Sequence, residues 1–77
     1  MADDGQPLSS LPAGSAGTVT AVKVADKGRL LEMGLLPGTR VEVVRYAPLG
    51  DPIEIKIRGY NLSLRKHDAE QVWIQPV

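Results

Sequence analysis

Residues 30–38 (LLEMGLLPG) constrain the fold more than any other part of the chain, because they combine the end of a helix with a chain reversal. The leucines and the methionine favour helix. Gly34 can take the left-handed conformation that closes a helix without a Cβ clash. Pro37 fixes φ, and Gly38 can supply the positive φ of a type II turn. A helix this short gains little stability alone, so its leucines must pack against a sheet formed by the rest of the chain.

The strands of that sheet are predicted from β-branched and alternating segments. Ile53, Ile55 and Ile57 alternate with charged residues, which indicates a strand with one buried and one wet face. The first strand carries valine on both of its faces, so a bend or a bulge is expected there. The predicted strands are 17–24, 40–46, 53–57, 60–65 and 72–74.

These segments predict a mainly β fold, a small closed barrel of about five strands with one short helix inserted after the first strand. We expect this helix over residues 27–33, with Asp26 as its N-cap. The polar residues 66–71 can add one helical turn before the last strand. At 77 residues the chain forms one domain, which we place at 8–77 after a flexible leader over 1–7.

The composition argues against several classes of function. The chain has no cysteine, so neither a disulfide nor a thiolate metal site can form. Its nine basic and nine acidic residues cancel, and two tyrosines and one tryptophan offer few stacking platforms for nucleic acid. No apolar run approaches the roughly 20 residues of a membrane helix. We therefore expect a soluble cytoplasmic protein that neither inserts into membranes nor binds nucleic acid.

Residues able to hold a metal or perform catalysis are few. The oxygen and nitrogen ligands are His67, Asp68 and Glu70, with Asp3, Asp4 and Asp51 elsewhere. One histidine beside acids in a charged turn is typical of a solvated surface, because a transition-metal site needs several ligands that converge from fixed elements. Neither a phosphate-binding loop nor a dinucleotide-binding glycine motif occurs. We expect no metal site, no cofactor and no catalytic residue.

Three segments resemble the FeoA family in their residues and order: 30–38 (LLEMGLLPG), 45–52 (RYAPLGDP) and 62–66 (LSLRK). The resemblance implies an SH3-like barrel in a small cytosolic protein of bacterial ferrous-iron uptake. It also implies a partner, the membrane GTPase transporter FeoB, on which a non-enzymatic accessory protein docks to support or regulate Fe²⁺ transport. The same fold occurs in DtxR-type repressors, so a metal-responsive regulatory domain is the alternative.

Docking on a partner requires exposed apolar side chains, and the sequence offers them in two places. Pro48 and Leu49 lie in a loop too rich in proline and glycine to pack deeply. Leu49 either fills a pocket on the partner or folds back to cap one end of the barrel. Leu35 and Leu36 point in opposite directions in an extended chain, so one of them is expected to be exposed. We take Leu36, Pro48 and Leu49 as contact candidates.

Basic side chains on the predicted hairpin complete this set. Lys56, Arg58, Arg65 and Lys66 can share its wet face despite the zero net charge of the chain. This face is either simply solvated or attracts an acidic protein surface, and we favour the second interpretation. Lys56 and Arg58 are therefore expected to lie near Leu49 and to orient the partner.

Overall fold

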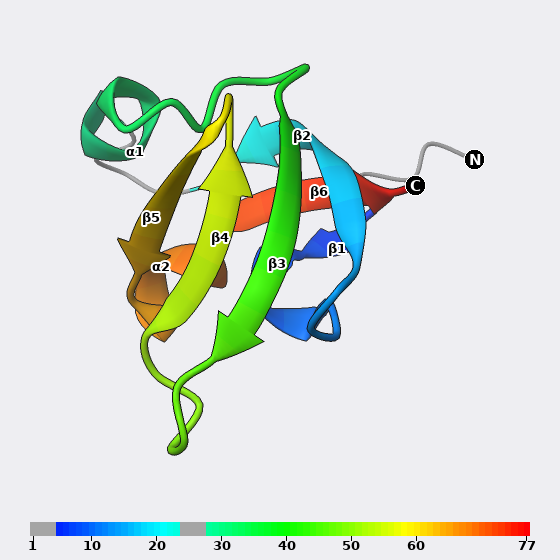
Figure 1. The fold of residues 1–77 in the computed structure, drawn as a ribbon. Helices are drawn as coiled ribbons and strands as arrows, with labels where there is room; N and C mark the ends of the chain where they lie inside the picture. Colours follow the sequence, from blue (N-terminus) through cyan, green and yellow to red (C-terminus); the bar gives the residue numbers. More distant parts are fainter. Residues whose placement is uncertain (1–4, 24–27) are drawn as a thin grey trace.

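The computed structural model describes residues 5–23 and 28–77 of the chain. They form one six-stranded antiparallel sheet with two short α-helices and one 3-10 turn (Figure 1). The elements are β1 (Gln6–Pro7), η1 (Leu8–Ser10), β2 (Ala16–Val22), α1 (Gly28–Glu32), β3 (Arg40–Tyr46), β4 (Ile53–Ile57), β5 (Tyr60–Leu64), α2 (Lys66–Ala69) and β6 (Val72–Pro76). The predicted mainly β class, the strand over 40–46 and the hairpin that follows it are confirmed.

The sheet curls into a small barrel in the strand order β1-β6-β2-β3-β4-β5. In Figure 1, β3, β4 and β5 form the front wall, and β2, β6 and β1 lie behind them. The small, mainly β barrel that the sequence predicts is confirmed, with six strands in place of about five; within the described residues no ladder joins β5 to β1. Arg29 of α1 and Asp68 of α2 form an ion pair of 2.7 Å between the two helices, which lie on the β5 side of the barrel.

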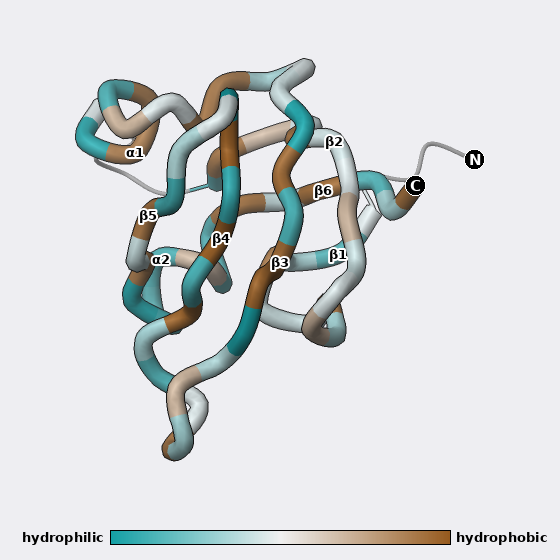
Figure 2. The backbone as a smooth tube through the Cα atoms, in the orientation of Figure 1, coloured by the Kyte–Doolittle hydropathy of each residue, from teal (hydrophilic) through white to brown (hydrophobic). Residues whose placement is uncertain are grey.

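The core follows the predicted alternation. Ile55 and Ile57 pair with Val43 and Val41 in the β3–β4 register, and all four side chains are buried. The hydrophobic and hydrophilic bands along β3 and β4 are visible in Figure 2. The other core side chains are Leu8, Leu11, Val19, Val22, Leu30, Leu35, Ile53, Leu64, Ala69, Val72 and Ile74.

The first long strand contains the expected bulge. Its register against β6 shifts between Val19 and Ala21. The extra residue lets both Val19 and Val22 face the core, although three positions separate them and a regular strand would place them on opposite faces. Val24, expected to continue this strand, lies outside the described residues, and β2 ends at Val22.

The end of α1 has the hydrogen bonds of a Schellman motif. Gly34 has φ +100°, and its N–H donates to the carbonyl of Leu31 at 3.0 Å. The N–H of Leu35 donates to the carbonyl of Leu30 at 3.2 Å, and both of these leucines are buried. The helix therefore buries its apolar end as the sequence predicts. Its described part spans Gly28–Glu32 and ends one residue before the predicted end at 33, and the predicted start at 27 lies outside the described residues. The expected N-cap, Asp26, is outside the described residues.

The chain then reverses at Pro37 and Gly38. Gly38 has φ +91°, and the N–H of Thr39 donates to the carbonyl of Leu36 at 3.0 Å, as in a type II turn. The predicted reversal is therefore confirmed. It delivers the chain directly into β3.

The described residues before η1 pair with the sheet. Gln6 and Pro7 pair with Ile74 and Trp73 as the edge strand β1. A Cβ atom at Gly5, which has φ +90°, would lie 1.8 Å from the carbonyl oxygen of Ile74, so the backbone packs closely there too. Backbone pairing needs no apolar side chain, so polar residues before the domain can join the sheet edge; the division into a leader over 1–7 and a domain over 8–77 stays a prediction.

Candidate docking surface

Two exposed surfaces flank the β3–β4 hairpin, and the first is the tip of its loop. We call Pro48 and Leu49 the loop tip. Leu49 is 95% exposed, as the sequence predicts, and the alternative, that it folds back to cap the barrel, is wrong. The tip is shaped by a turn in which the N–H of Gly50 donates to the carbonyl of Ala47 at 2.7 Å. A large apolar side chain is thus held in water on an ordered turn.

Hydrogen bonds on both sides fix the base of this loop. The Asp51 carboxylate accepts a hydrogen bond from the backbone N–H of Lys66, at the start of α2, at 3.0 Å. On the other side, the hydroxyl of Tyr46 donates to the carbonyl of Leu11 and lies 3.2 Å from that of Ser9. Burial raises the pKa of Tyr46 above its usual value. Asp51, a possible metal ligand from the sequence, therefore has a structural partner.

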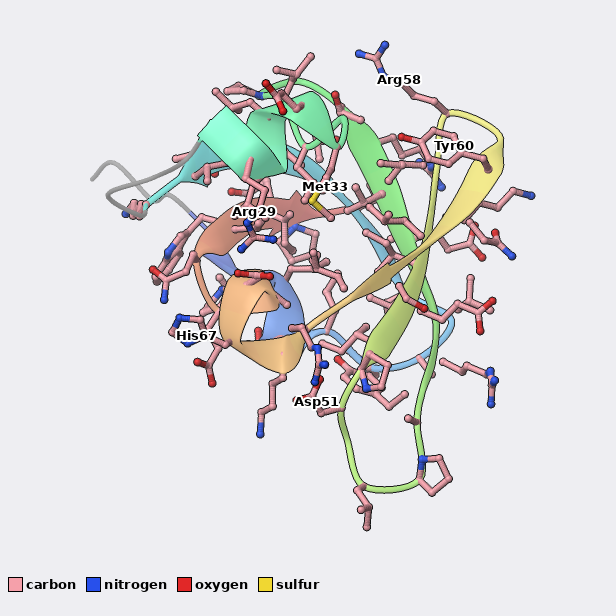
Figure 3. All side chains as sticks on the ribbon, turned by 90° about the vertical axis from the view of Figure 1, so that its left-hand side faces the viewer. Arg29, Met33, Asp51, Arg58, Tyr60 and His67 are labelled. Carbon is pink, nitrogen blue, oxygen red and sulfur yellow. The ribbon has the colours of Figure 1, made fainter. Side chains whose placement is uncertain are left out.

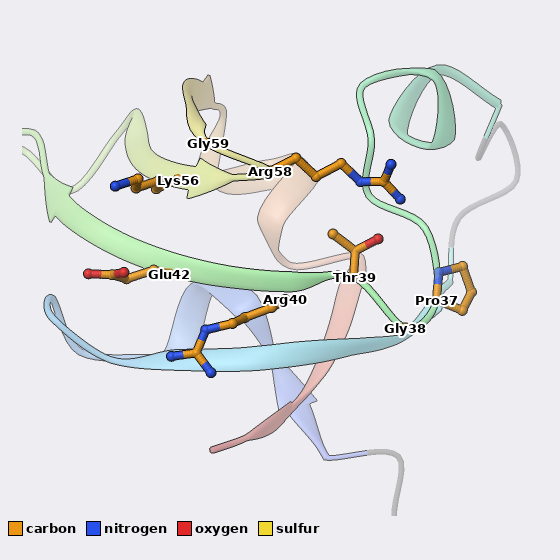
Figure 4. Close-up of a pocket in the computed structure, with 8 residues that line it drawn as sticks. All are labelled: Pro37, Gly38, Thr39, Arg40, Glu42, Lys56, Arg58 and Gly59. Carbon is orange, nitrogen blue, oxygen red and sulfur yellow. The ribbon is translucent and has the colours of Figure 1, made fainter.

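The second surface is an open groove of about 550 Å³ at the other end of the hairpin. We call it the basic groove. Its lining comes from the outward faces of the paired strands β3 and β4 and from the turns that precede β3 and follow β4 (Figure 4). The lining residues are Pro37, Gly38, Thr39, Arg40, Glu42, Lys56, Arg58 and Gly59.

Positive charge predominates in the basic groove. Its lining contains three cationic side chains, Arg40, Lys56 and Arg58, and one carboxylate, that of Glu42, which is paired in register with Lys56. None of these three cations forms an ion pair with another residue that the structure describes. Further along the same two strands, Arg45 does pair with its cross-strand neighbour Glu54, at 2.9 Å. The groove is therefore the part of this face where positive charge is left uncompensated.

Arg58 adopts an unusual backbone conformation. It has φ +50°, and Gly59 has φ +86°, in the two-residue turn between Ile57 and Tyr60. Such type I′ turns favour asparagine or glycine at the first position, because a Cβ atom is strained at positive φ. Figure 4 shows Arg58 extending over the end of the groove that the Pro37–Thr39 turn closes, with Lys56 and Glu42 towards the other end.

The structure divides the predicted contact residues between the two surfaces. Lys56 and Arg58 lie in the basic groove, and Leu36, which is 38% exposed, precedes its first lining residue. Its neighbour Leu35 is buried, as expected for one of the two. The β3 and β4 strands separate the groove from the loop tip by about 20 Å. Figure 3 shows Arg58 and the loop at opposite ends of the molecule, so the expectation that Arg58 lies near Leu49 is wrong. Lys56 lines the basic groove together with Arg58.

Sequence reasoning missed Arg40 as a member of this surface. Its position was available in principle, because Val41 and Val43 assign Arg40 and Glu42 to the outward face of the same strand. What was lacking was the register that places this strand beside Lys56 and Arg58.

The metal-ligand candidates do not converge in the described part of the chain. Asp68 is nearly buried and pairs with Arg29, whereas His67 is exposed on the same short helix (Figure 3). No group of three histidine, aspartate or glutamate side chains able to hold a metal occurs among residues 5–23 and 28–77. Asp3 and Asp4 lie outside these ranges. No described helix is long and apolar enough to cross a membrane.

The curled sheet, the short inserted helix and the two surfaces around one hairpin define a small SH3-like domain. Comparison with known families gives a more specific assignment, since the FeoA domain profile matches residues 6–76. The chain belongs to the FeoA family.

The similar proteins agree with this assignment. Over 72 residues the chain is 39% identical to an Fe(2+) transport protein A/Fe(2+) transporter FeoB fusion protein of Porphyromonas gingivalis, and this match covers 88% of the chain but 8% of the relative. The solution structure of a FeoA-like protein from Clostridium acetobutylicum shares 31% identity, with a TM-score of 0.90 over 99% of this chain and 91% of that one.

Two further structures concern metals. Stenotrophomonas maltophilia FeoA, an SH3 domain protein crystallised with zinc, shares 28% identity and a TM-score of 0.77, with 88% of this chain and 87% of that chain covered. A manganese-dependent transcriptional repressor superposes with a TM-score of 0.87 over 99% of this chain and 38% of its own, but at 21% identity. The second similarity shows a shared fold and nothing further about function.

Proposed function

We propose that this protein is a non-enzymatic, cytoplasmic accessory protein of bacterial ferrous-iron uptake, which docks on the transporter FeoB and supports or regulates Fe²⁺ transport. The observation that carries the proposal is the P. gingivalis relative, in which a FeoA region and FeoB form one polypeptide. The chain spans only 8% of that relative. We take the FeoB part of the fusion protein to be the partner. Covalent fusion keeps two domains at a high effective concentration, which is useful when they act together.

The loop tip is the contact that we assign to this docking. Leu49 is almost fully exposed on a loop whose base is hydrogen-bonded to both the barrel and α2. A rigidly presented apolar side chain loses little conformational entropy when it enters a pocket on a partner. Leu36 offers a second, smaller apolar contact at the other end of the hairpin.

The substitution Leu49→Asp tests this function. Because the side chain lies in water, the charge should leave the thermal midpoint unchanged within about 2 °C, as most surface substitutions do. The variant should fail to co-purify with FeoB and fail to restore Fe²⁺ uptake to cells that lack the native protein. Val77→Asp is the matched control, because Val77 is also an exposed apolar residue but belongs to neither surface.

A stable Leu49→Asp protein that binds FeoB and supports uptake normally would exclude the loop tip as the contact. Failure of the unmodified protein to co-purify with FeoB at all would contradict the proposed function itself.

A further inference from the structure

We infer that the basic groove binds an extended, carboxylate-rich segment of a partner protein. The identification of this partner as FeoB rests on the proposed function, whereas the binding of carboxylates by the groove does not. Arg40, Lys56 and Arg58 all line one open groove and lack ion-pair partners among the described residues. Guanidinium groups match carboxylates in a bidentate geometry, and the ammonium group of lysine adds a point charge.

The shape of the groove suits an extended chain. Its floor is formed by the outward side chains of β3 and β4, which are paired neighbours, and the turns before β3 and after β4 close one end. Alternate residues of an extended peptide point to the same side and are about 6.6 Å apart. A segment with acidic residues at alternate positions can therefore direct two carboxylates at cations of the groove.

Two features favour an acidic peptide over a nucleic acid. None of the lining residues is aromatic, so the groove has no platform on which bases could stack. Glu42 lies opposite Lys56 within the groove, where it would repel the continuous phosphates of a polynucleotide. A peptide avoids this repulsion because uncharged residues can occupy the position over Glu42.

The backbone at Arg58 supports the same inference. A residue at φ +50° in a tight turn would be more stable as asparagine or glycine, yet an arginine occupies the position and extends over the groove. Strained residues of this kind concentrate at binding sites, where the side chain is needed in one direction.

The test is an NMR titration of the isolated chain with a synthetic peptide of about eight residues that alternates glutamate and alanine. Saturable amide shifts are expected at Arg40, Glu42, Lys56, Arg58 and Gly59, and the affinity should fall as salt rises from about 50 to 300 mM. Arg58→Gln and Lys56→Gln should each weaken binding about threefold to fivefold.

Two variants on the same strands sharpen this test. Glu42→Gln should tighten binding, because it removes the one carboxylate of the groove. Arg45→Gln is the matched control, since Arg45 lies on the same face but is already paired with Glu54, and it should leave the affinity unchanged.

Several results would overturn the inference. Absence of saturable shifts in the groove, equal losses in Arg58→Gln and Arg45→Gln, or weaker binding in Glu42→Gln would each do so. Tighter binding of inorganic phosphate or of a single-stranded oligonucleotide than of the peptide would assign the groove to phosphate instead.

The partner is tested separately. If the unmodified protein co-purifies with FeoB and the Lys56→Gln/Arg58→Gln protein does so equally well, the groove does not hold a FeoB segment. If FeoB binds neither protein, the proposed function fails, and the peptide titration still decides whether the groove recognises carboxylates.

Discussion

Single residues of this domain show where stability and binding make opposite demands. Arg58 occupies a turn position that suits asparagine or glycine, and its side chain is exposed. Tyr46, in contrast, is half-buried, and its hydroxyl holds η1 and the following residues against the base of the β3–β4 loop. The first residue contributes little to stability, whereas the second contributes through hydrogen bonds that water cannot replace equally well.

Arg58→Asn should therefore make the protein more stable and weaken the binding of an acidic peptide to the basic groove. Asparagine tolerates positive φ, so we expect a gain of about 0.5–1 kcal/mol in the free energy of unfolding, measured by urea denaturation. Gly59→Ala, at φ +86° in the same turn, is the control and should lower stability. A less stable Arg58→Asn protein would show that the arginine side chain stabilises the turn in a way that its exposure does not suggest.

The hydroxyl of Tyr46 predicts a pH dependence of stability. Because burial raises its pKa above the usual value of about 10, folding favours the neutral phenol. This contribution is present below pH 10 and is lost as pH rises through the raised pKa of the folded protein. Tyr46→Phe should cost about 1 kcal/mol at pH 7 and should lose less stability than the unmodified protein between pH 9 and 11. An equal loss of stability in the two proteins between pH 9 and 11 would contradict this account.

At the scale of elements, the two short helices are stabilised by contacts with residues distant in sequence. The helices α1 and α2 have five and four residues, too few to be stable alone, and the Arg29–Asp68 ion pair links them. In addition, α2 contacts η1, and the hydroxyl of Tyr60 on β5 donates to the carbonyl of Met33 at the end of α1. The central strand of the β3–β4–β5 meander, β4, is paired on both sides and carries three buried isoleucines.

Ile55→Ala should accordingly destabilise the domain severely. Ile55 is fully buried at the middle of β4, so the cavity and the lost apolar contacts should cost about 2–5 kcal/mol. That is a large share of the stability of a domain of this size. The adjacent exposed Lys56 provides the control, and Lys56→Ala should change stability by less than about 0.5 kcal/mol. An unchanged denaturation midpoint for Ile55→Ala would mean that the β4 side chain is not a core contact.

The elements were predictable from sequence where the signal is local. Alternating isoleucines, a helix-closing glycine and a proline–glycine turn all act within a few residues, and the structure confirms each one. The strand β1 was not predictable, because backbone pairing with β6, distant in sequence, holds Gln6 and Pro7 in place. The basic groove was also missed as a unit. The groove depends on the β3–β4 register. Because β4 runs from the loop to the other end of the barrel, residues that are close to the loop in sequence lie far from it in the structure.

At the scale of the whole molecule, the two surfaces are too far apart to act as one contact. The long axis of the molecule measures 34 Å, and the loop tip and the basic groove lie at opposite ends of the β3–β4 hairpin. One small pocket on a partner cannot cover both. The loop tip offers an apolar anchor, and the groove offers charge, which mainly affects specificity and the rate of encounter. The combination suits a domain that contacts a larger partner at two points.

Fusing the domain to FeoB tests whether Leu49 contributes only to the affinity of docking or also acts after docking. A flexible linker between the two chains raises their effective concentration to the millimolar range, which compensates for a weakened contact. We therefore expect Leu49→Asp, inactive as a separate chain, to restore Fe²⁺ uptake when it is fused to FeoB through a glycine–serine linker. The same fusion carrying Ile55→Ala is the control, because a destabilised domain should not be rescued by proximity. Uptake by cells that lack both native proteins is the measurement. A folded Leu49→Asp fusion that remains inactive beside an active unmodified fusion would show that Leu49 acts after docking, and the assignment of the loop tip as an affinity contact would then be wrong.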